Sequence, residues 1–239
     1  MKRLMLLLAI AGMSVGANAQ QSATSEIPTQ KHKIITNGFW DNWFIDFGGD
    51  FISNYSNQEV GVNNNPFSFD RGNFAFDVSV GKWATPSFGM RVKIGAAWAT
   101  QVNTPSDNPL FNQLQISAQP LLNLHNLFAG YKPRVWNTIL YGGIGYHRSF
   151  DFSDNAFFVG AGWLNTFNVT KRFHINIDLY ANMLEGDADG KSDNGSQWGG
   201  YTNNDWQIGW SIGCGFNLGK VGWDNAPDVD AIIAMNKAQ

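Results

Sequence analysis

The chain contains a single cysteine, Cys214, among its 239 residues. One cysteine excludes an internal disulfide framework and any metal site built from several cysteines. Charged residues are also scarce, because Asp, Glu, Lys and Arg make up 15% of the chain and leave a net charge of −3. This composition does not indicate a positively charged surface that would bind a phosphate backbone, so nucleic acid is not an expected partner.

Long hydrophobic runs are missing as well. After the N-terminal segment, no apolar run approaches the roughly 20 residues that a membrane helix needs. The mean hydropathy is −0.23. This value does not argue against a membrane β-barrel, since the hydropathies of alternating apolar and polar residues cancel within each strand. The 26 glycines and the 14% of aromatic residues suit closely spaced strands with large apolar side chains.

The N-terminal residues 1–19 have the organisation of an export signal. Lys2 and Arg3 provide a positive start, residues 4–10 an apolar core, and residues 17–19 (ANA) a small-x-small cleavage site. No cysteine follows the apolar core, which disfavours a lipid-anchored protein. We therefore expect an exported chain that begins at Gln20 and is either soluble outside the inner membrane or a barrel in the outer membrane.

The stretch of residues 206–218 (WQIGWSIGCGFNL) shows most clearly the alternating pattern that recurs along the sequence. Its even positions are Trp, Ile, Cys, Phe or Leu, and its odd positions are small or polar. Alternate residues of a strand lie on opposite faces, so this strand has one apolar and one polar face. The apolar face points inward in a soluble barrel and outward, to lipid, in a membrane barrel.

The same stretch carries the spacing of a last-strand assembly signal. The pattern is polar-x-Gly-x-x-aromatic-x-hydrophobic, and its positions are Ser211, Gly213, Phe216 and Leu218. This indicates an interaction with the outer-membrane assembly machinery.

Similar alternation predicts eight strands. Their expected ranges are 43–55, 73–83, 88–100, 113–124, 135–147, 156–167, 173–183 and 206–218. Pro120 predicts a bulge or kink in the fourth strand, and the direction of Trp163 in the poorly alternating sixth strand stays open. Long and short connections mostly alternate, as in outer-membrane barrels with periplasmic turns and exterior loops. We expect an all-β, eight-stranded, antiparallel, up-and-down transmembrane barrel over residues 43–218, with residues 20–42 as a periplasmic lead-in.

The polar faces carry charges of both signs, which are expected to pair inside the barrel. An eight-stranded barrel is just wide enough for side chains to fill, and unpaired buried charges are costly. The lumen ion-pair candidates are Asp46, Asp50, Asp77, Arg91, Lys93 and Asp178.

Aromatic residues gather near the expected strand ends, as in the interfacial girdles of membrane barrels. The girdle candidates are Trp43, Trp83, Trp98, Trp136 and Trp206. The alternative is that these aromatics form the core of a soluble secreted β-barrel that binds a small ligand. The export signal and the loop alternation favour the membrane barrel.

Three stretches together resemble OmpA-type outer-membrane proteins: residues 37–45 (NGFWDNWFI), 81–91 (GKWATPSFGMR) and 123–141 (NLHNLFAGYKPRVWNTILY). The resemblance covers residues 37–224 and implies an eight-stranded transmembrane barrel followed by a periplasmic peptidoglycan-binding domain. This chain departs from that pattern, because only residues 219–239 follow the last strand. We expect a periplasmic tail or the start of a helical linker there, and peptidoglycan contact is unsupported by this chain.

Two groups of residues are candidates for chemistry. His147 lies near Ser149, Asp151 and Asp154 at the expected exterior rim, but a solvated polar loop accounts for them better than a catalytic site. Asp187, Asp189 and Asp193 fail the calcium-loop pattern, because Lys191 and Ser192 stand at its fifth and sixth positions. We therefore expect no enzymatic activity, no metal and no cofactor.

The sequence thus favours a structural barrel in a Gram-negative outer membrane. Its resemblance implies support of envelope integrity, with exterior loops, above all residues 185–205, available to extracellular ligands. The alternatives are a narrow porin-like channel for small solutes, the soluble ligand-binding barrel, and an enzyme at the rim.

Overall fold

The structure is a computed structural model of the chain. It describes residues 29–34, 38–56, 63–69, 71–100, 110–151, 155–185 and 205–238. The expected export signal and the acidic positions 187, 189 and 193 lie outside these ranges. The chain divides into two compact units, of which Lys31–Asn225 contains the barrel and the other contains the stretch from Ala226 onward.

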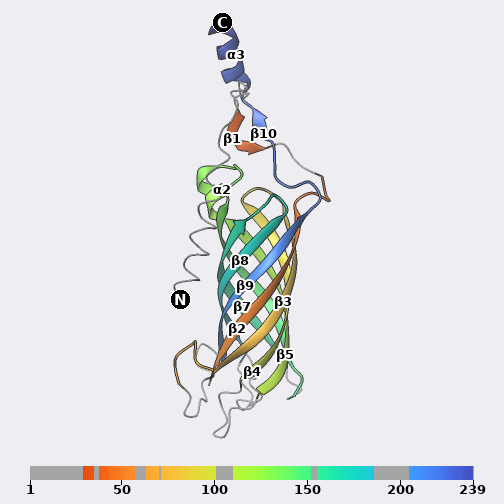
Figure 1. The fold of residues 1–239 in the computed structure, drawn as a ribbon, viewed down its shortest axis with the longest axis vertical. Coiled ribbons are helices and arrows are strands. Elements are labelled where there is room, and N and C mark those ends of the chain that lie inside the picture. Colours follow the sequence, from red (N-terminus) through yellow and green to blue (C-terminus); the bar gives the residue numbers. More distant parts are fainter. Residues whose placement is uncertain are drawn as a thin grey trace, which may run out of the picture. The chain divides into compact units, whose positions relative to one another are not determined.

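Eight antiparallel strands form one closed barrel, which confirms the expected fold class (Figure 1). They are β2 (Trp43–Tyr55), β3 (Gly72–Trp83), β4 (Phe88–Thr100), β5 (Leu110–Asn123), β6 (Trp136–Ser149), β7 (Asn155–Asn168), β8 (Phe173–Leu184) and β9 (Asp205–Leu218). The first and last strands close the ring, with Trp43 opposite Leu218 and Tyr55 opposite Trp206. Closure pairs every strand on both sides and leaves the barrel no free edge, as a lipid-embedded sheet requires.

Pro120 does not produce the expected bulge. Met90 pairs with Pro120 and the register between β4 and β5 stays constant from Phe88 to Thr100. On the other side, pairing with β6 is interrupted between Ala118 and Leu121 but resumes in the same register. A proline removes one backbone N–H donor. The strand pairing therefore lacks backbone hydrogen bonds near Pro120, but neither strand has the extra residue that defines a bulge.

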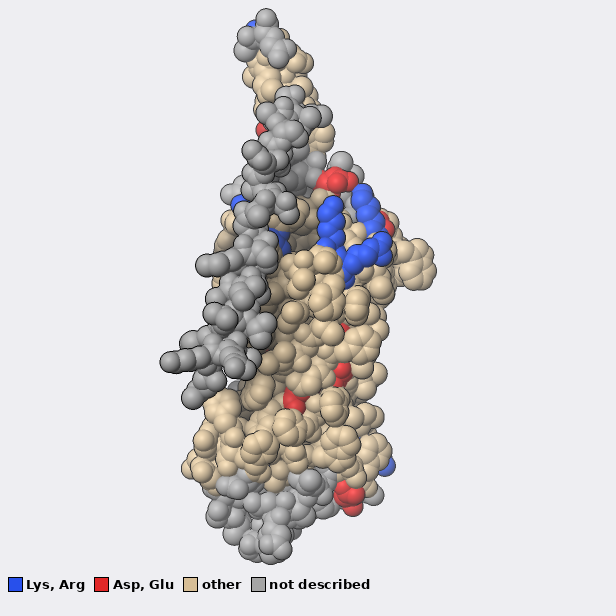
Figure 2. Space-filling view, viewed as in Figure 1, with Lys and Arg blue, Asp and Glu red and all other residues tan. Residues whose placement is uncertain are grey.

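The outer wall is apolar along its height. Exposed aliphatic and aromatic side chains occupy alternate positions of the strands, among them Val78, Ile94 and Ile144. Figure 2 shows a wall with almost no Lys or Arg between its two ends. Trp163 belongs to this outer face, where it is 47% exposed, and its indole donates a hydrogen bond to Thr138 Oγ1. The direction left open by the sequence is therefore outward.

Short connections gather at one end of the barrel. Residues 84–87 join β3 to β4, residues 169–172 join β7 to β8, and β5 leads into the helix α2 (Leu124–Ala129). The sequence predicted only a connection there, between the expected strands 113–124 and 135–147. The Asn123 side chain caps α2 by accepting a hydrogen bond from the Asn126 N–H at 3.0 Å, and Gly130 ends the helix with a φ of 71°. Asparagine at the N-cap and glycine after the last turn are the usual helix boundaries.

Two small elements flank the barrel in sequence. β1 (Thr29–Ile34) and β10 (Asn225–Pro227) form a two-stranded sheet. The helix α3 (Val229–Ala238) follows, and Asp228 accepts a hydrogen bond from the Ala231 N–H at 3.2 Å at its start. Neither α2 nor α3 is long and apolar enough to cross a bilayer, and the same is true of any helix in the described ranges.

Candidate functional site: the barrel lumen

The centre of the lumen holds a buried ion pair between β4 and β8. Arg91 Nη2 lies 2.8 Å from Asp178 Oδ2, and both side chains are under 5% exposed. Arg91 Nε also donates to Gln119 Oε1 at 2.6 Å, and the Tyr141 hydroxyl donates to Asp178 Oδ1 at 2.9 Å. The guanidinium carbon lies 4.6 Å from the centre of the Tyr141 ring, so both charges have several partners.

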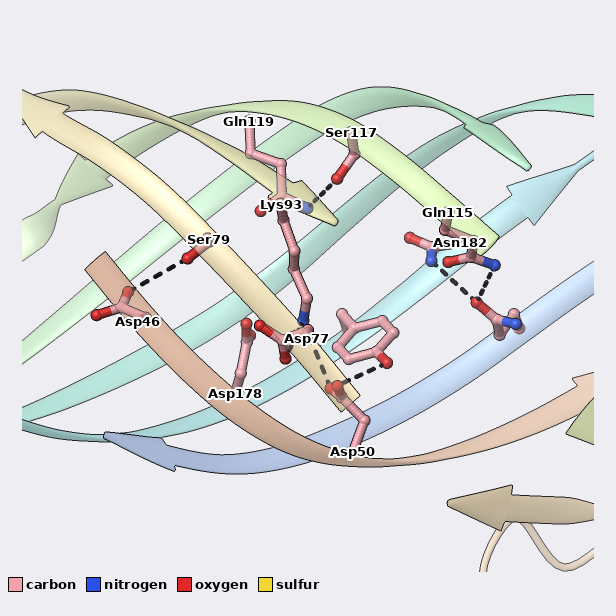
Figure 3. A network of polar contacts seen from close by, with 12 residues as sticks. Asp46, Asp50, Asp77, Ser79, Lys93, Gln115, Ser117, Gln119, Asp178 and Asn182 are labelled. Carbon is pink, nitrogen blue, oxygen red and sulfur yellow. Dashed lines mark hydrogen bonds and ion pairs between the residues drawn. The ribbon is translucent and has the colours of Figure 1, made fainter. Parts of the chain in front are cut away.

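A second cation, Lys93, bridges two carboxylates next to this pair. Its Nζ lies 3.0 Å from Asp77 Oδ2 and 3.4 Å from Asp50 Oδ1. The Tyr180 hydroxyl donates to the same Asp50 oxygen at 3.2 Å. Figure 3 shows Lys93 reaching from β4 toward Asp50 and Asp77 across the interior. Five of the predicted lumen charges therefore meet in the middle of the barrel.

The sixth predicted charge, Asp46, has a partner that the sequence did not suggest. Its Oδ1 lies 2.7 Å from His174 Nε2, and the Ser79 hydroxyl lies 3.5 Å from Oδ2. His174 occupies the polar face of its strand, as Asp178 does. The partnership could not be found from the sequence because the two residues lie 128 positions apart and meet only through the barrel register.

An apolar cluster lies inside the barrel next to the ion network. Its buried members are Phe44, Leu121, Ile139, Tyr141 and Leu164, with Trp83 and Tyr180 packed against it. These residues lie on inward faces of their strands, and the only one of them that the sequence predicted as a site residue is Trp83, as a member of the girdle. Trp83 is consequently not an outward girdle residue: it lies on the same face of β3 as Asp77, and its ring centre is 6.3 Å from that of Phe44.

The remaining girdle candidates point outward. Trp98, Trp136 and Trp206 are 51%, 47% and 43% exposed. Trp43 is half-buried, and its indole donates to the Phe39 carbonyl at 2.8 Å.

The residues of the expected assembly signal fall on both faces of β9. Phe216 and Leu218 are exposed on the outer face. Ser211 is buried on the inner face and lies opposite Asp50 and Asp178 in the neighbouring strands. A Cβ at Gly213 would approach the Phe47 carbonyl closely, so this position needs a residue without a side chain.

On the other side of the ion network, amide side chains fill the lumen. Gln207 Oε1 accepts from Gln115 Nε2 at 2.9 Å and from Asn182 Nδ2 at 3.3 Å, and Gln207 Nε2 donates to Asn54 Oδ1 at 3.1 Å. His147 is 1% exposed, and its Nδ1 lies 3.2 Å from Gln115 Nε2. The structure therefore places His147 within the barrel and not on the exposed rim.

Little space is left around the charges. The cavity beside the network, lined by Asp50, Lys93 and Tyr180 among others, has a volume of about 30 Å³, which is room for no more than a few water molecules. No group of three or more His, Cys, Asp or Glu side chains with metal-ligand geometry occurs within the part of the chain that the structure describes. The middle of the lumen, around the ion network, is therefore packed and ion-paired.

The sequence has two similar curated proteins from Porphyromonas gingivalis. Outer membrane protein 41 is 25% identical over 96% of this chain and 62% of its own length. Outer membrane protein 40 is 28% identical over 96% of this chain and 61% of its own length. This is an outer-membrane β-barrel protein. A closed barrel with an apolar outer wall and a charged interior agrees with that assignment to the Gram-negative outer membrane, and it excludes the soluble barrel with an inward apolar face.

Solved outer-membrane barrels also resemble the protein. Neisserial surface protein A has a TM-score of 0.49 at 11% identity, over 74% of this chain and 97% of that one. The N-terminal β-barrel domain of Pseudomonas aeruginosa OprF has a TM-score of 0.39 at 11% identity, over 75% of this chain and 99% of that one. No family profile matches the chain. The chain spans about three fifths of the length of the two curated relatives.

Proposed function

We propose that this outer-membrane protein is a closed structural barrel that supports the integrity of the envelope and presents its longer connections outside the cell. The proposal rests on one observation, the ion network that crosses the lumen. The Arg91–Asp178 and Lys93–Asp77 pairs occupy the space that a channel would need. No catalytic step is assigned to any residue.

The orientation follows from the connections. In outer-membrane barrels short turns face the periplasm and long loops face the exterior. The short connections 84–87 and 169–172, the start of β2 and the end of β9 would then lie on the periplasmic side, and the longer connection between β8 and β9 would lie outside. The exterior loops would carry recognition of extracellular ligands. We also propose that the assembly machinery reads Phe216 and Leu218, which are exposed on the last strand.

Conductance in planar bilayers separates the structural barrel from the narrow porin-like channel. The wild-type protein is expected to show no channels. Replacing the bridging cation, Lys93→Ala, should create brief conducting events, because Asp50 and Asp77 lose the cation that holds them together. Steady wild-type channels whose conductance is unaffected by Lys93→Ala would contradict a lumen closed by this network.

The envelope role needs a cellular measurement. A strain without the gene should become sensitive to detergents that the intact outer membrane excludes, and the wild-type gene should restore resistance. A variant with the connection 185–204 shortened to a tight turn should also restore resistance, because the barrel supplies the structural role. If only the full-length connection restores it, recognition by the loop is the main function.

A further inference from the structure

The barrel encloses a second, much larger cavity at the end that carries the short connections. Its volume is about 570 Å³, which falls within the range of small-molecule sites. Four members of the apolar cluster line it, namely Phe44, Leu121, Ile139 and Leu164, and the carboxylate of Asp46 lies in its wall as well. Its walls come from the barrel interior, and its rim comes from the stretches 131–135, 168–171 and 220–224. Nothing in the structural role proposed above uses this space.

The inner part of the cavity combines apolar walls with one unpaired polar atom. Phe44, Leu121, Ile139 and Leu164 line it, together with His174. His174 is 4% exposed, its Nε2 faces Asp46, and its buried Nδ1 has no hydrogen-bond partner among the residues that the structure describes. A buried polar atom without a partner costs free energy. A ligand that hydrogen-bonds to Nδ1 removes this cost and therefore binds more tightly.

The rim is positively charged. Lys132, Arg134 and Lys171 all line it, and no carboxylate of the described stretches lies within ion-pair distance of any of them. Figure 2 shows Lys and Arg side chains gathered at this end of the barrel. Unpaired cations around a partly apolar concavity raise the local concentration of anions.

The arginine of the rim is held in place by its neighbours. Arg134 Nη1 donates to Asn126 Oδ1 at 2.6 Å and Nη2 donates to the Gly130 carbonyl at 2.9 Å. Lys220 also lines the cavity, but its ammonium is already paired with Asp224 at 3.0 Å. That hydrogen bond raises the pKa of Lys220 above its usual value. Three cations therefore remain for a ligand.

From this arrangement we infer that the cavity binds a small anionic amphiphile. Its phosphate or carboxylate group contacts Lys132, Arg134 and Lys171, its short apolar body packs against the walls, and a polar atom reaches His174 Nδ1. The same chemistry is found in a bilayer phospholipid with an anionic headgroup and in a free single-chain phosphate ester. The inference is independent of whether the protein supports envelope integrity.

Hexyl phosphate is a suitable probe because it combines one anionic group with one short chain. The full chain, refolded in phosphatidylcholine nanodiscs with isotope-labelled histidine, would be titrated while the imidazole resonances are followed by NMR. The His174 resonance should shift saturably with hexyl phosphate. Inorganic phosphate alone and hexanol alone should each bind at least about tenfold more weakly, since each offers only one kind of contact.

Neighbouring residues of one turn provide a matched pair of variants. Both side chains are exposed, but Lys171 lines the cavity and Arg172 does not. Lys171→Gln should weaken hexyl phosphate binding about tenfold, the size expected for one charge-assisted hydrogen bond, and Arg172→Gln should leave it within about twofold. Lys132→Gln provides an independent second rim variant. An unchanged heat-dependent shift on an SDS gel verifies that each variant is folded.

Three results would overturn the inference: no saturable shift of His174, equal binding of hexanol and hexyl phosphate, or equal losses in Lys171→Gln and Arg172→Gln. A further titration identifies the source of the natural ligand. Tighter binding of dihexanoyl phosphatidic acid than of hexyl phosphate supports the site and indicates a bilayer lipid. The reverse order also supports the site and indicates a free single-chain molecule.

Discussion

The Arg91–Asp178 pair allows a sharp test of how the barrel is held together. Asp178→Asn keeps the shape of the side chain but leaves the buried guanidinium without the carboxylate 2.8 Å away. Removing one partner of a buried pair costs about 3–5 kcal/mol, because an uncompensated charge remains in the interior. At about 1.4 kcal/mol per factor of ten, the equilibrium constant for unfolding should rise by roughly two to three and a half orders of magnitude.

The double replacement distinguishes pairing from packing. Arg91→Met alone should also cost about 3–5 kcal/mol, since Asp178 then keeps only the Tyr141 hydroxyl. Arg91→Met combined with Asp178→Leu leaves no charge behind and should be more stable than either single variant, because apolar replacements of buried pairs are often neutral or stabilising. The two single effects should therefore be strongly non-additive.

Urea unfolding in lipid vesicles measures these free energies, with the folded fraction read from the mobility of unheated samples on an SDS gel. Lys220→Gln serves as a control, because it removes an exposed ion pair and should leave the midpoint unchanged. If the double variant were as unstable as the sum of the single variants, or if Asp178→Asn unfolded at the wild-type midpoint, the reasoning about a paired, desolvated interior would be refuted.

Two further predictions concern the wall of the barrel. Ile94→Arg, in the middle of β4 on the outer face, should cost about 2–4 kcal/mol in the same urea assay, whereas Phe88→Arg at the strand end should cost about 0–1 kcal/mol; equal costs would contradict a lipid-facing wall. Gly215→Ala should destabilise the barrel, because the new Cβ would overlap the Asp46 carboxylate and the His174 imidazole. Gly49→Ala should be tolerated, because its Cβ would meet no atom nearer than 3.9 Å. A Gly215→Ala protein with wild-type stability would show that this packing is loose.

Much of the wall could be predicted from the sequence because strand periodicity is a local property. Alternation alone gave the bounds of β2 and β4 as the structure has them. It also placed Arg91 and Asp178 on inward faces, since one inward residue in a strand fixes the direction of the others. The same rule, applied without exception, would have turned Trp83 inward with Asp77; its assignment to the girdle relied on its place near a strand end.

Two features differ from the sequence prediction for different reasons. The α2 helix lies between the expected strands 113–124 and 135–147, and its boundaries are local, since Asn123 caps its start and Gly130 follows its last turn. The bulge expected at Pro120 is absent because both neighbouring strands keep a constant register past this residue.

The sequence by itself determined which side chains share a face of each strand, because two-residue periodicity records that pattern. The export signal and the alternating loop lengths then favoured the apolar faces on the outside of the barrel. Only the tertiary structure decided which inward residues meet. Asp46 contacts His174 across 128 positions, and Phe44 joins Leu121 and Leu164 in an inner apolar layer. Those contacts follow from ring closure and strand register, which combine all eight strands at once.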